Sequence, residues 1–149
     1  MTGGTWLLLV ALAATLFSTG VIWFMQVLEY PLFAFVGEDA FPAFHEQHNR
    51  RLPGVVFLPM LVAFASSVGL LFVRPAAVPG WLALLGVLLV AIVLVSSFTL
   101  LIPRHMQLSE GGYSLSLIQE LVRFNWLRTV AWSLHALVLL TMLVRTLRG

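Results

Sequence analysis

The chain contains no cysteine and no lysine, and only 9% of its residues are charged. Without cysteine, this chain cannot form disulfides, catalyse through a thiol or ligate an Fe–S cluster. The net charge of +2 is too small and too dispersed for a nucleic-acid-binding surface. Soluble domains carry about a quarter charged residues. The shortage of charge therefore indicates a membrane protein with lipids as its neighbours.

Long apolar runs fill most of the chain, whose mean hydropathy is +1.01. Runs of about 20 residues have the length of a membrane-spanning helix. They lack the alternation of barrel strands. We predict an all-α fold, a polytopic bundle of four transmembrane helices with a long, partly helical first loop. It forms a single domain, 1–149, with helices at about 5–28, 54–73, 81–102 and 114–146.

Prolines mark the predicted helix ends, because proline lacks the backbone N–H that a helix interior needs. Pro31 follows the first run, Pro53 opens the second and Pro103 ends the third. Residues 29–52 form the longest connection. We expect this connection to contain a short helix at about 38–51 and to fold over the bundle as a lid or re-entrant element.

Ionisable residues gather in the first and third connections, which a four-span chain places on the same side. These connections carry His45, His48, Arg50, Arg51, Arg104, His105, Glu110, Glu120 and Arg123. The positive-inside rule favours the cytoplasmic side for them. The first run lacks the positive n-region of a signal peptide, so we expect it to be an uncleaved span.

One face of the fourth run carries polar and aromatic residues at helical spacing: Asn125, Arg128, Trp132 and His135. Ionisable residues at such depth usually face a bundle interior or cavity. Two structural alternatives remain open. His135 can bond a hydroxyl of a neighbouring helix, and Arg128 can extend to the membrane interface.

The first run carries a matching stripe that ends in Gln26 and Tyr30. We expect Gln26 and Tyr30 to face Asn125 and Arg128. The alternative is an interhelical hydrogen bond with an interfacial tyrosine.

Three histidines are candidates for proton transfer or ligand binding. If residues 45–51 are helical, His45, His48 and Arg51 share a face, and His105 adds a third imidazole. Together with Arg128, these residues suit an anion or enolate oxygen. Alternatively, His45, His48 and His105 bind a metal. No cofactor is favoured; metal and haem remain alternatives.

Four short motifs follow one layout. They are Gln26-x-x-x-Tyr30-Pro31, Phe44-His45-x-x-His48-x-x-Arg51, Pro103-x-His105 and Asn125-Trp126-Leu127-Arg128-Thr129. With them the chain resembles small four-helix bacterial membrane proteins of unknown function, which are distantly similar to the anthrone-oxygenase-like group. The resemblance implies a bundle in the bacterial cytoplasmic membrane with a polar pocket at one face. It also implies cofactor-independent oxidation of an aromatic molecule.

We therefore predict an oxygenase- or oxidoreductase-like membrane enzyme for a hydrophobic aromatic or quinone-like molecule. The predicted catalytic residues are His48, His105, Arg128 and Tyr30. The predicted substrate-binding residues are Gln26, His45, Arg51, Asn125, Trp126, Trp132 and His135. The open alternatives are an accessory or pigment- or lipid-binding subunit of a membrane complex, a metal- or haem-binding protein, and a homo-oligomer.

Overall fold

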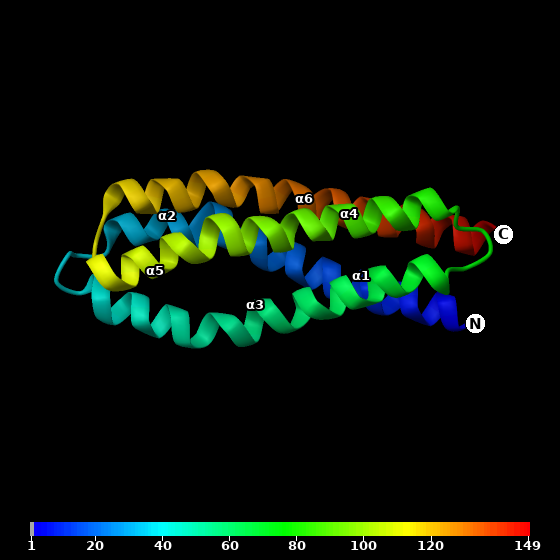
Figure 1. Ribbon diagram of the computed structural model, residues 1–149, viewed down its shortest axis with the longest axis horizontal. Coiled ribbons are helices and arrows are strands. Elements are labelled where there is room, and N and C mark those ends of the chain that lie inside the picture. Colours follow the sequence, from blue (N-terminus) through cyan, green and yellow to red (C-terminus); the bar gives the residue numbers. More distant parts are fainter. Residues whose placement is uncertain (1) are drawn as a thin grey trace.

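The computed structural model describes residues 2–149, which form four long helical segments lying side by side (Figure 1). The first segment comprises α1 (Gly3–Phe24), the π-helical turn η1 (Met25–Glu29), α2 (Tyr30–Leu32) and the 3₁₀ turn η2 (Phe33–Phe35). The second is α3 (Phe41–Phe72). The third comprises α4 (Gly80–Ser96), the π-helical turn η3 (Ser97–Leu101) and α5 (Ile102–Gly111). The fourth is α6 (Leu115–Arg148).

The four segments make an integral membrane bundle, which confirms the predicted fold class. Each is long and apolar enough to cross a membrane. At 1.5 Å per residue α6 is about 50 Å long, so it extends beyond a hydrocarbon core of about 30 Å. Packing forms a closed ring in which α1 contacts α3 and α6, and α4 contacts the same two helices. Both termini lie at the end of the 73–79 connection, opposite the 36–40 and 112–114 connections (Figure 1).

The first connection differs from the prediction, because the chain stays helical through most of it. Residues 36–40 alone separate the first two segments. The helix expected at 38–51 is present but continues directly into the second span, since Pro53 lies inside α3. Within residues 2–149, this connection is accordingly too short to form the expected lid or re-entrant element. Prolines bend helices, and α3, which also contains Pro59, curves along its length (Figure 1).

A π-helical turn precedes each of the two prolines that were expected to end a span. The N–H of Tyr30 bonds to the Met25 carbonyl one residue before Pro31. The N–H of Ile102 bonds to the Ser97 carbonyl one residue before Pro103. The wider turn relieves the clash between a proline ring and the preceding turn. Both helices therefore continue past the prolines, with Tyr30 directly before Pro31 and His105 two residues after Pro103.

At the end of the bundle that holds the termini, α1 approaches the 73–79 connection closely at Gly4. A Cβ at Gly4 would lie 2.7 Å from the Val73 carbonyl oxygen, whereas a Cβ at Gly3 would have no atom within 4 Å. Gly4→Ala should therefore lower the free energy of unfolding by about 1–3 kcal/mol. Gly3→Ala is the matched control and should not destabilise. Thermal unfolding in detergent measures both, and equal melting temperatures would contradict the close approach.

Candidate functional site

Three histidines from two helices meet at the end of the bundle remote from the termini. His45 and His48 lie on α3, and His105 lies on α5. Their ring planes are within 16° of parallel, and their centroids are 5.4–6.0 Å apart. The Phe33 ring stands nearly perpendicular to them, with its centroid 5.0 Å from that of His48. The histidines lie together as the spacing suggested, but on helices rather than on loops.

Two of these histidines belong to a hydrogen-bonded chain that runs from the surface to Tyr30. The amide nitrogen of Asn49 donates to His45 Nδ1 at 3.3 Å and to the exposed Ser109 Oγ at 3.0 Å. An acceptor at Nδ1 leaves the proton of a neutral His45 on Nε2, which then donates to His105 Nδ1 at 3.1 Å. His105 Nε2 in turn donates to the Tyr30 hydroxyl at 3.3 Å. Ser109 Oγ also lies 3.3 Å from His45 Nδ1, so hydroxyls and imidazoles form a continuous path along which protons can pass, whereas the Asn49 amide only orients His45.

The third histidine is paired with a carboxylate. His48 Nδ1 lies 2.9 Å from Glu29 Oε1. Since a carboxylate only accepts hydrogen bonds, Nδ1 carries the proton. His48 Nε2 is buried and has no hydrogen-bond partner. An imidazole oriented by a carboxylate at one nitrogen, with the other nitrogen free, is the arrangement of a general base.

The polar stripes of the first and fourth segments form a buried network. Gln26 Nε2 donates to the Val122 carbonyl at 3.1 Å, and Asn125 Nδ2 donates to Gln26 Oε1 at 2.9 Å. Arg128 Nη1 donates to Asn125 Oδ1 at 3.3 Å. Gln26 and Asn125 therefore use their amides on the protein itself, and Asn125 contacts Arg128 directly.

Arg128 is a buried cation without a counterion. The residue is 4% exposed, so it does not extend to the interface. Within residues 2–149, no carboxylate lies within ion-pair distance of its guanidinium, and its Nε has no hydrogen-bond partner. A buried charge is costly unless it is paired. The site therefore favours an electron-rich oxygen beside Arg128.

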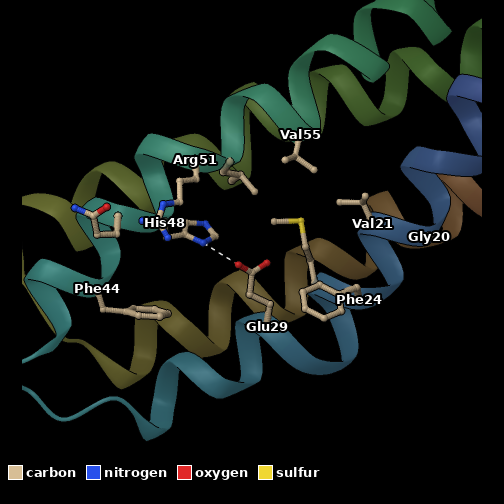
Figure 2. A pocket seen from close by; sticks show the side chains of 11 residues that line it. Gly20, Val21, Phe24, Glu29, Phe44, His48, Arg51 and Val55 are labelled. Carbon is tan, nitrogen blue, oxygen red and sulfur yellow. Dashed lines mark hydrogen bonds and ion pairs between the residues drawn. The ribbon is translucent and has the colours of Figure 1, made fainter.

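An outer pocket of about 540 Å³ lies between α1, η1 and α3. Figure 2 shows the Glu29–His48 pair across it, with Val21 and Phe24 on one wall and Val55 on the other. The lining is mostly apolar, and its rim includes the exposed side chains of Phe24 and Val55. At this depth such a rim faces lipid. The lining residues are Gly20, Val21, Phe24, Met25, Glu29, Phe44, Gln47, His48, Arg51, Leu52 and Val55.

Two smaller cavities lie behind the outer pocket, and Met25 lines all three spaces. The inner cavity, of about 10 Å³, is lined by Ser18, Val21, Ile22, Met25, Val55, Val56, Met60, Arg128 and Trp132. The tyrosine cavity, of about 40 Å³, brings Tyr30, His105 and Arg128 to one space. The predicted catalytic residues thus line spaces that share Met25: His48 lines the outer pocket, and Tyr30, His105 and Arg128 line the tyrosine cavity.

Not all predicted binding residues lie at these spaces. Arg51 lines the outer pocket and Trp132 the inner cavity. Trp126 is 45% exposed and packs edge-on against Trp23 on the outer surface. His135 is fully buried elsewhere, with its ring nitrogens 3.2 Å from Thr15 Oγ1 and 3.1 Å from Ser67 Oγ. Its surroundings match the structural alternative, a histidine bonded to hydroxyls.

The histidine cluster is not arranged as a metal site. Across residues 2–149, no group of three or more His, Cys, Asp or Glu side chains is placed to hold a metal ion. His45 and His105 direct one ring nitrogen each at the other. Those nitrogens serve the hydrogen-bonded chain instead.

Sequence reasoning did not select Glu29, Met25 or Ser18. Glu29 ends a charge-free run and resembles an ordinary interfacial residue. The useful signal was its position, three residues after Gln26 and next to Tyr30, which places it at the depth of the candidate site. Nothing in the sequence distinguishes Met25 or Ser18 from other residues of a span.

Comparison with protein-family models, with curated proteins and with solved structures finds no match to this chain. The four apolar helices agree with a small four-span membrane protein, as the resemblance implied. The family itself stays a prediction that rests on the short motifs.

Proposed function

We propose that the protein is a membrane enzyme of the oxygenase or oxidoreductase type that acts on a lipid-soluble aromatic or quinone-like molecule. The observation that carries this proposal is the His48–Glu29 pair at the polar end of an apolar pocket open to lipid. A hydrophobic ring would enter from the bilayer and lie between Val21 and Val55. Its acidic C–H or O–H group would meet His48 Nε2.

His48 acts as the general base in this proposal. Its Nε2 takes a proton from the substrate, and Glu29 stabilises the imidazolium that forms. Removal of the proton leaves an electron-rich carbanion or phenolate. Arg128 stabilises the oxygen on which that charge gathers, because a donor fixed in a water-poor site stabilises developing charge strongly.

Dioxygen, which dissolves in the bilayer, is the oxidant in this proposal. For a ring methylene next to an aromatic system, the carbanion adds O₂, and loss of water leaves a carbonyl. The overall conversion is CH₂ plus O₂ to C=O plus H₂O. The chain from Tyr30 through His105 and His45 to Ser109 supplies a route for protons between this site and the aqueous face.

Glu29→Gln tests the pair directly. The amide still accepts a hydrogen bond but no longer stabilises an imidazolium, so turnover should fall about ten- to a hundredfold. Oxygen consumption with anthrone as probe, in lipid nanodiscs and corrected for protein-free discs, measures this. Glu46→Gln is the matched control, because Glu46 is 64% exposed and pairs only with Arg50. A Glu29→Gln variant as active as the Glu46→Gln variant would refute the role of the pair.

A non-enzymatic pigment- or lipid-binding subunit is the second candidate, and the sideways opening of the outer pocket toward lipid favours it. The same assay separates the two functions. A binding subunit holds the ring compound in wild-type protein but consumes no oxygen above the protein-free background.

A further inference from the structure

Three buried side-chain atoms within residues 2–149 lack a hydrogen-bond partner: Ser18 Oγ, His48 Nε2 and Arg128 Nε. Buried polar groups nearly always have partners. His48 lines the outer pocket, while Ser18 and Arg128 line the inner cavity. The unpartnered atoms therefore belong to residues that line two different spaces.

The unpartnered state of Ser18 is unusual for this molecule. Several other hydroxyls in the spans donate to the carbonyl four residues earlier, as Ser66 does to Val62 and Ser96 to Ile92, while Thr15 and Ser67 bond to His135. Ser18 makes no such bond and is only 8% exposed. Its hydroxyl is left available to a group in the inner cavity.

The inner cavity has the size and chemistry for a single oxygen atom. Its volume of about 10 Å³ is close to the smallest space that holds a water. Of its two donors, Arg128 is a cation without a counterion, and Ser18 supplies a hydroxyl. An anionic or carbonyl oxygen satisfies both.

The outer pocket and the inner cavity have a shared wall that includes an adaptable side chain. The outer pocket and the inner cavity share Val21, Met25 and Val55 as lining residues. Methionine is unbranched and adjusts its shape more readily than the other apolar side chains. A ring in the outer pocket can therefore place one substituent past Met25 without a shift of the helices.

We propose that the inner cavity is an oxygen-binding subsite, with Ser18 and Arg128 as donors and Met25 as its movable wall. The ligand is then a flat ring compound with chemical groups at opposite edges. One edge carries the acidic group that faces His48, and the other carries an oxygen that accepts from Ser18 Oγ and Arg128 Nε. This inference rests on the proposed function and restricts its substrate class. Fatty acids are excluded because they are not flat rings, and hydrocarbons are excluded because they lack the oxygen.

Binding of two probes to protein in lipid nanodiscs tests the subsite. The probes are anthrone, whose acidic methylene lies opposite its carbonyl oxygen, and 9,10-dihydroanthracene, which has no oxygen; binding is measured under nitrogen so that anthrone is not turned over. Ser18→Ala should weaken anthrone binding about three- to tenfold, the effect of one lost hydrogen bond, and leave binding of the hydrocarbon unchanged. Ser18→Val, which fills the cavity, should weaken anthrone binding at least as much. Ser66→Ala is the matched control and should bind both probes like wild type.

The subsite is refuted if Ser18→Ala and Ser18→Val bind anthrone as tightly as wild type, or if they weaken the binding of both probes by the same factor. If oxygen consumption with anthrone still depends on Glu29 in that case, the proposed function stands and the subsite alone fails. If wild-type protein binds neither probe, both proposals fail. Melting temperatures of the variants establish that each one is folded.

Discussion

His48→Gln is expected to reduce turnover by about 10²–10⁴-fold, the range that a positioned general base contributes. Glutamine can still bond to Glu29 but cannot accept a proton at neutral pH. Binding of the ring compound should change little, because most of the outer pocket is apolar. The expected result is therefore a fall in kcat with a nearly constant KM in the oxygen-consumption assay.

His135→Gln makes the same chemical change at a histidine away from the pocket. His135 bonds to Thr15 and Ser67 and is fully buried. We expect this variant to keep its turnover and to lose about 1–3 kcal/mol of stability through its broken hydrogen bonds. If His135→Gln lost activity while His48→Gln retained it, the base would be misassigned.

Arg128→Met is expected to reduce turnover by about 10²–10³-fold, as loss of a transition-state donor does. The melting temperature should stay the same or rise. Arg128 is a buried charge with no carboxylate partner among residues 2–149, and replacing such a charge with an apolar side chain removes a desolvation cost. An arginine that served only the fold would give the opposite result, lower stability with normal turnover of the folded fraction.

Arg104→Met supplies the comparison for Arg128. Arg104 pairs with Glu120 at 3.0 Å near the surface. Exposed ion pairs contribute about 0–1 kcal/mol. We expect Arg104→Met to change both turnover and melting temperature little. Equal losses of turnover in Arg104→Met and Arg128→Met would show that turnover requires the net positive charge of this end of the bundle and not Arg128 itself.

The sequence predicted the four spans and the facing polar stripes, because both follow from periodicity. Helical spacing placed Gln26 opposite Asn125, and the two amides do bond to each other. It also grouped His45 with His48 on one face of a helix. These features depend on local geometry, which residue order determines.

The missed features depend on contacts between segments. Pro31 and Pro53 were expected to bound helices, but packing against neighbouring helices keeps the chain helical through both. Met25 lines three spaces that are formed by residues from all four helical segments, so they exist only in the assembled bundle. The role proposed for Glu29 depends on its contact with His48, which lies 19 residues away along the chain.

The π-helical turns at Met25–Glu29 and Ser97–Leu101 each add a residue to what would otherwise be a regular helix. One extra residue rotates everything after it by about 100°. The π-helical turns therefore rotate Tyr30 and His105 toward the interior of the bundle. As a result, the direction of the last helical turns does not depend on which residues of the preceding span face lipid. Substitutions on the lipid-facing surfaces can therefore leave the candidate site unchanged. Deletion of a single residue from either π-helical turn would instead rotate Tyr30 or His105 out of the interior.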